Sequence, residues 1–182
     1  MLIRDADPAN DAGACAAVYA PFVLHTVASL EEQAPGRPEF AGRMERISQT
    51  HPWLVASVDD AVIGYAYASS HHERAAYRWA ANVAVYVDAS HQRRGVGRAL
   101  YGALLPLLAR QGLQVACAGV TLPNQASIGL HERFGFKPVG IYHRIGWKAG
   151  AWWDVGWWEL ELRAPDLDGP PAEPGPPARL GA

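Results

Sequence analysis

The sequence has little of the material from which disulfide frameworks, metal centres and membrane spans are built. It contains two cysteines, Cys15 and Cys117, with neither metal-ligand nor redox spacing around them, so we expect buried thiols and no metal site. No apolar run approaches the roughly 18 to 20 residues that cross a bilayer. Residues 1–7 also lack the basic and apolar regions of a leader. These features predict a cytoplasmic chain without a membrane partner.

Charge of one sign is also scarce. Eighteen acidic against sixteen basic residues leave a net charge of −2, and no basic run is long enough to grip a phosphate backbone. Nucleic acid is therefore not an expected partner. Hydrophobic residues are abundant at 49% of the 182 residues, with 19% charged, which excludes a disordered chain and fits one domain around one core.

Hydrophobic periodicity predicts a mixed α/β domain over residues 1–165. Strands are expected at 2–6, 53–58, 62–69, 79–87, 115–122, 136–147 and 153–162, and helices at 8–26, 39–49, 96–112 and 124–134. Asp59 and Asp60 provide hairpin chemistry between the second and third strands, and Pro106 is expected to kink a helix without dividing it. Residues 166–182, with five prolines and three glycines, predict a disordered tail.

The segment over residues 82–100 combines a β-type run, a glycine-containing turn and the start of a helix. Gly95 and Gly97 allow a tight turn and a close approach of the backbone to a ligand, while the free N–H groups of the first helical turn converge on one point. The helix dipole makes that point attractive to anions, and three arginines between residues 93 and 98 add full positive charges. The segment therefore predicts a pyrophosphate site.

The spacing separates this segment from other phosphate loops. A P-loop needs four residues between its glycines and a following Gly-Lys-Ser/Thr, and a dinucleotide fingerprint needs a third glycine; both patterns are absent. A Gly-x-Gly at a helix start is also compatible with an ordinary tight turn, so the neighbouring motifs have to decide.

Those motifs resemble the GNAT superfamily of N-acetyltransferases. Residues 92–97 have the form of that superfamily's acetyl-CoA loop after its central strand, and residues 122–136, with their Gly135-Phe136 helix end, look like its second cofactor segment. Four further motifs resemble the phosphinothricin acetyltransferase group within it, at residues 76–79, 85–87, 119–124 and 153–158. The resemblance covers residues 2 to about 163.

The resemblance implies a twisted, mostly antiparallel seven-stranded sheet with about four helices, in which the strand ending at Val87 and the strand ending near Thr121 splay apart. It also implies acetyl-CoA as co-substrate, with the pantetheine arm between the splayed strands and the pyrophosphate on backbone amides of the loop. The implied contacts are Val85, Tyr86, Val87, Arg93, Arg94, Gly95, Val96, Gly97, Arg98 and Asn124. The side chains of Val83, Val85 and Val87 are equally compatible with plain sheet core.

Helical spacing places Asn124, Ser127 and His131 on one face, with Leu130 and Phe134 turned toward the core. By resemblance this face lies at the thioester end of the slot, and His131 stands where many superfamily members have a tyrosine acid. Acetyl transfer needs a neutral amine, a polarised carbonyl and a protonated leaving thiol. We therefore expect His131 to be a catalytic residue that transfers a proton, while a backbone N–H on the splayed strand polarises the carbonyl.

On the acceptor side, the phosphinothricin group has a glutamate, its base, at the position that Asn82 occupies here. An amide does not accept a proton near neutral pH, so the base is open between His131 alone and a loop acid, Glu31, Glu32 or Glu73. The substrate-binding residues that the resemblance implies are Arg74, Tyr77, Asn82 and Thr121. The fork-shaped guanidinium of Arg74 suits a carboxylate or phosphinate.

We expect an acetyl-CoA-dependent N-acetyltransferase that acts on the amine of a small amino-acid-like acceptor, of the phosphinothricin or methionine sulfoximine type. Two alternatives stay open: acetylation of a protein N-terminus or another amine, and a non-catalytic acyl-CoA-binding module, which Asn82 alone favours. Too many tryptophans for one small core lie near the C-terminal strands, which predicts a pocket wall or a homodimer contact. These are Trp147, Trp152, Trp153, Trp157 and Trp158.

Overall fold

The structure is a computed structural model that describes residues 1–164, 169 and 171–181. Its strands are β1 (Leu2–Asp5), β2 (Trp53–Val58), β3 (Ala61–Ser70), β4 (Ala80–Val87), β5 (Val115–Thr121), β6 (Lys137–Lys148) and β7 (Ala151–Glu161). Its helices are α1 (Pro8–His25), α2 (Arg37–Ser48), α3 (Val96–Gln111) and α4 (Gln125–Arg133), with short 3-10 turns η1 (Ala75–Tyr77) and η2 (Ala89–His91). Every predicted element is present, with ends shifted by at most two residues. In the described part of the chain, no helix has the length and apolar composition of a membrane span.

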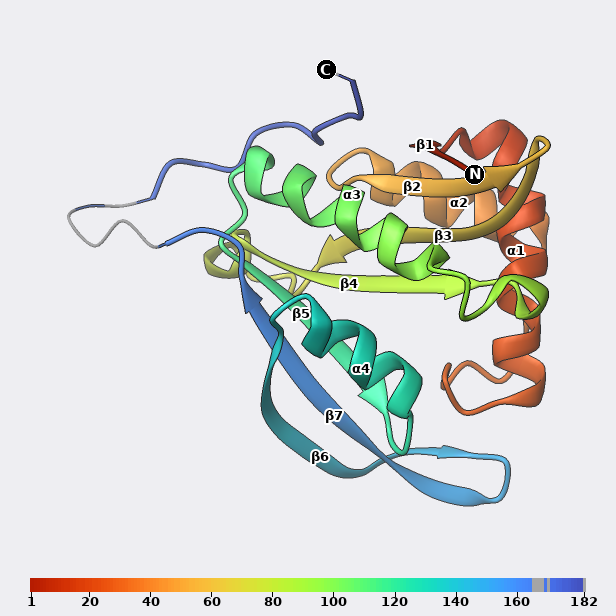
Figure 1. The fold of residues 1–182 in the computed structure, drawn as a ribbon. Helices are drawn as coiled ribbons and strands as arrows, with labels where there is room; N and C mark the ends of the chain where they lie inside the picture. Colours follow the sequence, from red (N-terminus) through yellow and green to blue (C-terminus); the bar gives the residue numbers. More distant parts are fainter. Residues whose placement is uncertain (165–168, 170, 182) are drawn as a thin grey trace.

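The seven strands form one sheet in the order β1-β2-β3-β4-β5-β7-β6. All neighbouring pairs are antiparallel except β4 and β5, which confirms the predicted mostly antiparallel sheet. Side chains of α3 pack with one set of sheet residues, and side chains of α1 and α2 pack with a separate set on the opposite face. Figure 1 shows these two layers of helices on the sheet, with the β6–β7 hairpin projecting beyond it.

Local chemistry accounts for the turn between β2 and β3 and for the course and end of α3. Asp59 and Asp60 join β2 to β3 with φ angles of 47° and 63°, the left-handed conformation that a two-residue hairpin turn requires and that Asp tolerates. Helix α3 runs through Pro106 as one helix and ends at Gly112, whose φ of 98° is the left-handed cap expected there.

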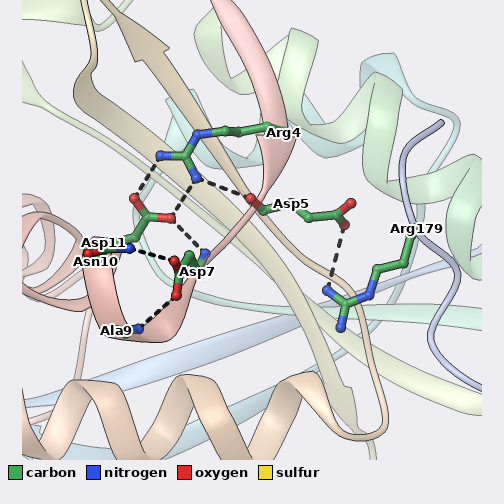
Figure 2. Close-up of polar contacts among 7 residues, drawn as sticks. All are labelled: Arg4, Asp5, Asp7, Ala9, Asn10, Asp11 and Arg179. Atoms are coloured by element: carbon green, nitrogen blue, oxygen red, sulfur yellow. Dashed lines mark hydrogen bonds and ion pairs between the residues drawn. The ribbon is translucent and has the colours of Figure 1, made fainter.

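A polar cluster attaches the edge strand β1 to α1 (Figure 2). The Arg4 guanidinium donates to both carboxylate oxygens of Asp11 at 2.7 Å, and the backbone N–H of Asp7 donates to the same carboxylate at 2.7 Å. Burial favours the neutral acid, but these donors favour the carboxylate more, so the pKa of Asp11 falls below its usual value. Asp7 also caps the first turn of α1 with its own carboxylate.

Described residues of the tail contact the domain, and the disorder expected of residues 166–182 stays a prediction. The Trp79 indole donates to the carbonyl of Ala172 at 2.8 Å, and the N–H of Gly175 donates to the carbonyl of Gln111 at 2.7 Å. Leu180 packs against the core cluster that includes residues of α3. The tail therefore crosses the C-terminal end of α3, and its remaining positions, 165–168, 170 and 182, lie outside the described residues.

Candidate functional site

The turn before α3 presents backbone N–H groups to solvent. Arg93 and Gly95 have φ angles of 59° and 84°, so the chain folds back on itself twice before the helix begins. The first bond of the helix runs from the N–H of Ala99 to the carbonyl of Gly95, and Gly95 has no side chain to cap the three donors between them. Arg93, Arg94 and Arg98 are exposed around these donors. This positive cradle is the predicted pyrophosphate site.

Below the cradle, β4 and β5 separate. They pair only over three residues, Ala80–Asn82 with Val115–Cys117, and both strands continue beyond that point. β4 stays paired with β3 as far as Val87, and β5 stays paired with β7 as far as Thr121, so each has one edge without a strand partner. Figure 1 shows the two strands diverging from a common point. The predicted splay is therefore present, and an extended ligand can hydrogen-bond along the open edge of β4.

Gly97 is the place where the cradle and the open edge meet. A methyl group on this residue would lie 3.8 Å from Val85, 3.9 Å from Val87 and 3.3 Å from Leu130. The first turn of α3 thus lies directly over the end of β4, with α4 alongside. A ligand whose anionic group binds in the cradle can therefore extend along the adjoining backbone edge of β4 into the splay.

Helix α4 differs from the prediction at His131. This residue, expected to face the slot, is only 4% exposed and is the buried residue of the helix. Leu130 and Phe134 pack against the core as expected, with Leu130 beside Gly97. Asn124 is the N-cap: its side-chain oxygen accepts the N–H of Ser127 at 3.1 Å. The helix turns this way because His131 has polar and aromatic partners in the interior.

Both ring nitrogens of His131 are hydrogen-bonded within the protein. Nδ1 lies 2.8 Å from the carbonyl oxygen of Ser127, which only accepts, so Nδ1 carries the hydrogen. Nε2 then accepts a hydrogen bond from the Tyr101 hydroxyl, 3.0 Å away, and Tyr101 is 0% exposed. Burial lowers the pKa of His131, and the bond to Ser127 offsets this only in part. The catalytic role of His131 stays a prediction, and in this geometry neither nitrogen is open to a substrate.

The point where β4 and β5 separate is marked by a pair of polar side chains. Asn82, the last residue of β4 to pair with β5, has its amide oxygen 2.9 Å from Nδ1 of His71, in the segment after β3. The His71 ring is edge-on to Trp157, with centroids 6.0 Å apart, and lies 6.1 Å from the ring of Tyr77. Trp157 in turn covers Gly119 of β5, where a Cβ atom would come within 3.2 Å of the indole.

The model of the acetyltransferase (GNAT) family matches residues 23–136. A phosphinothricin N-acetyltransferase of Streptomyces viridochromogenes is 38% identical over 164 residues, covering 90% of this chain and 88% of that protein. The chain belongs to the GNAT family of acetyltransferases.

Two further GNAT relatives extend the match over nearly the whole length. An L-methionine sulfoximine/L-methionine sulfone acetyltransferase of Salmonella typhimurium is 34% identical, covering 91% of this chain and 99% of that protein. The crystal structure of a phosphinothricin acetyltransferase from Sinorhizobium meliloti, in complex with acetyl-CoA, superposes with a TM-score of 0.88 at 32% identity, covering 94% and 93% of the two chains.

The predicted acceptor-side residues of this GNAT site fall into two groups. Arg74 and Tyr77 are exposed, Arg74 at the N-cap of η1 and Tyr77 within it, and the Tyr77 ring lies 6.1 Å from that of His71. Thr121 is buried at the far end of β5, four residues beyond the partner of Asn82, which corresponds to about 13 Å along a strand. The structure therefore brings Tyr77 and Asn82 to one end of the splay through His71, with Arg74 nearby in the chain, and leaves Thr121 at the other end.

The loop acids offered as bases have other partners or exposed positions. The Glu31 carboxylate accepts hydrogen bonds from two guanidinium nitrogens of Arg43, at 2.7 and 2.9 Å, and from the Tyr19 hydroxyl at 2.8 Å. The hydrogen bonds from Arg43 hold the pKa of Glu31 below its usual value despite partial burial. Glu32 and Glu73 are exposed.

Sequence reasoning missed His71, although a signal for it exists in the strand register. Ser69 of β3 pairs with Asn82, and side chains two residues apart lie on the same face of a strand, so His71 is the diagonal neighbour of Asn82. Without the register, His71 reads as one of two adjacent histidines in a polar loop.

Proposed function

We propose that this GNAT protein moves the acetyl group of acetyl-CoA to the amine of a small amino-acid-like acceptor. The observation that carries the proposal is the meeting of the arginine-rich cradle and the open edge of β4 at Gly97. The first-turn amides of α3 would hold the pyrophosphate, with Arg93, Arg94 and Arg98 adding charge. Backbone groups over residues 85–87 would pair with the pantetheine amides, and one N–H of this edge would polarise the thioester carbonyl.

The acceptor class rests on the relatives and on the residues at the closed end of the splay. The named relatives acetylate phosphinothricin, methionine sulfoximine or methionine sulfone, each of which carries an α-amine and a carboxylate. Arg74 carries an exposed guanidinium at the start of η1, three residues before Tyr77, and a guanidinium is suited to that carboxylate. Thr121 would line the other end of the pocket.

Thiol release from acetyl-CoA across a panel of acceptors tests this function. The panel contains phosphinothricin, methionine sulfoximine, methionine sulfone, a polyamine and peptides with free N-termini, and calorimetry measures acetyl-CoA binding separately. We expect turnover on the amino-acid analogues. Turnover confined to peptides or polyamines would refute the proposed amino-acid-like acceptor. Acetyl-CoA binding without turnover on any amine would indicate an acyl-CoA-binding module.

A homodimer is part of the same proposal. The β6–β7 hairpin exposes a cluster of large apolar side chains, 49–60% accessible: Val139, Ile141, Tyr142, Ile145, Trp147 and Trp152. Trp147 and Trp152 contact each other on this surface, whereas Trp158 is buried. Several large apolar side chains exposed on one hairpin are typical of a subunit contact, and we propose that a second copy of the chain covers them. A cytoplasmic location also stays a proposal, consistent with two free cysteines.

A further inference from the structure

The pair formed by His71 and Asn82 has the geometry of a general base and its positioning residue. The amide oxygen of Asn82 faces Nδ1 of His71 at 2.9 Å. An amide oxygen only accepts hydrogen bonds, so Nδ1 carries the hydrogen and the lone pair of the neutral imidazole is on Nε2. Within the part of the chain that the structure describes, no group hydrogen-bonds to Nε2, and the residue is half-buried. His131 differs on both counts.

One backbone hydrogen bond and two aromatic contacts hold His71 in place. The backbone N–H of His71 donates to the carbonyl of Ala80 at 3.3 Å, which continues the β3–β4 pairing one step beyond the strand. Trp157 meets the ring edge-on, and the ring of Tyr77 is tilted against it, with centroids 6.1 Å apart. A base that is fixed by its neighbours loses little freedom when the substrate binds.

The pair also lies where the acetyl group has to stop. Strand pairing between β4 and β5 resumes at Asn82 and Cys117, so an extended arm that enters the splay from the cradle can go no deeper than this residue pair. A thioester at the end of that arm therefore arrives beside Asn82. The acceptor amine has to meet it there, within reach of the His71 ring.

We propose that His71 is the base of this acetyltransferase and that Asn82 positions it, so that an imidazole–amide pair replaces the glutamate of the phosphinothricin group. The assignment rests on the proposed function. Nε2 accepts one proton from the substrate ammonium, and the freed lone pair forms the C–N bond to the thioester carbonyl carbon. The C–S bond then breaks, the thiolate takes the second proton from the substrate nitrogen to leave a neutral amide, and the imidazolium of His71 returns its proton to water.

Other titratable and charged groups surround His71 on the elements packed against it. Its own loop and η1 contribute His72, Glu73, Arg74 and Tyr77, β5 contributes Cys117, and β7 contributes Glu159. Cys117 stays a thiol because burial, with a smaller contribution from Glu159, raises its pKa. Glu159 is opposite Cys117 on the far side of β5 from Asn82, so it is two strands away, about 10 Å.

The test measures kcat and kcat/KM of His71→Gln against pH on whichever amine the wild type acetylates best. We expect kcat near pH 7 to fall by about 100-fold, with acetyl-CoA affinity unchanged by calorimetry. In the variant, kcat/KM should keep rising with pH into the range where the free amine loses its own proton, because no protein base is left. The proposal would be overturned by an unchanged kcat together with an unchanged acid limb, which is the rise of kcat/KM with pH on the acidic side of the profile.

Two further variants separate positioning from general damage to the loop. His72→Gln, the neighbouring and exposed histidine, should keep the acid limb of the wild type. Asn82→Asp should move the acid limb to higher pH, since a carboxylate beside Nδ1 stabilises the imidazolium. An acid limb that His72→Gln removes, or that Asn82→Asp leaves in place, would count against the pair.

Nitrogen-15 NMR of the imidazole rings supplies a readout that does not depend on turnover. The His71 signal should show the hydrogen on Nδ1 in the wild type and a mixture of tautomers in Asn82→Ala; the opposite tautomer in the wild type would refute the pair. The two proposals fail differently. A wild type that binds acetyl-CoA but acetylates no amine refutes the proposed function, whereas normal turnover in His71→Gln refutes only the base.

Discussion

The Tyr101–His131 hydrogen bond gives a quantitative test of whether His131 is a structural residue. Three variants are needed: Tyr101→Phe, His131→Phe and the double variant. Each single change leaves one buried partner unsatisfied, Nε2 in the first and the Tyr101 hydroxyl in the second. An unsatisfied buried polar group costs about 1–3 kcal/mol. The phenyl ring preserves the aromatic contact with Phe136, whose centroid is 5.1 Å from that of His131.

The double variant removes both polar groups, so the desolvation penalty does not accumulate. We expect the sum of the losses of unfolding free energy in the two single variants to exceed the loss in the double variant by about 1–3 kcal/mol, as for other directly contacting pairs. The larger volume of phenylalanine at position 131 occurs in both the single and the double variant and cancels in the cycle. Urea unfolding at pH 8 measures all four proteins, and each kcal/mol corresponds to about 2–4 °C in melting temperature. Additive losses would show that the Tyr101 hydroxyl and the His131 ring do not depend on each other.

The same variants predict a pH dependence. Burial lowers the pKa of His131 in the folded state, so the unfolded chain binds a proton more readily. The stability from the neutral ring is complete above the unfolded value of about 6.5 and is lost as the pH falls below it. The stability gap between wild type and His131→Phe should therefore shrink from pH 8 to pH 5.5. His51, also buried with a lowered pKa, is present in both proteins and does not affect the difference.

Turnover of His131→Phe decides between the two roles. If the ring is structural, kcat stays within about tenfold of wild type, whereas loss of a proton-transferring residue costs about 100-fold or more at unchanged acetyl-CoA affinity. The second result would restore the catalytic role predicted from the sequence.

Three other predictions concern the cradle and the hairpin. Gly95→Ala should weaken acetyl-CoA binding and lower the free energy of unfolding by about 1–2 kcal/mol, because the φ of 84° at this position is strained for alanine. Gly102→Ala, in open space on α3, should instead raise the free energy of unfolding by about 0.5–1 kcal/mol. Calorimetry measures binding and thermal unfolding measures stability, and equal effects of the two changes would exclude backbone strain as the cause. Arg94→Gln should weaken acetyl-CoA binding about two- to fivefold and reduce its salt dependence, and salt titrations that match wild type would remove this arginine from the cradle. Trp152→Glu should halve the mass seen by light scattering, and a dimer that survives the charge would place the subunit contact elsewhere.

The sequence predicts the cradle and the order of elements well because both depend on neighbours along the chain. The left-handed angle at Gly95, the free amides that follow it and the nearby arginines lie within a few residues of one another. Alternating runs and helical spacing likewise identify the seven strands and four helices to within two residues. The splay itself was expected only through resemblance to a family, since nothing local shows where two strands stop pairing.

The rotation of α4 and the partner of Asn82 depend on contacts between distant segments. A nine-residue helix with apolar and polar residues on several sides does not reveal which side faces the core, and the polar partner that draws His131 inward is Tyr101, thirty positions earlier. His71 likewise reaches Asn82 only because β3 and β4 pair in one register; a slip of one residue would send its side chain to the opposite face. Residue types and local geometry can thus be read along the chain, but which side chains meet in the site follows from how the elements pack.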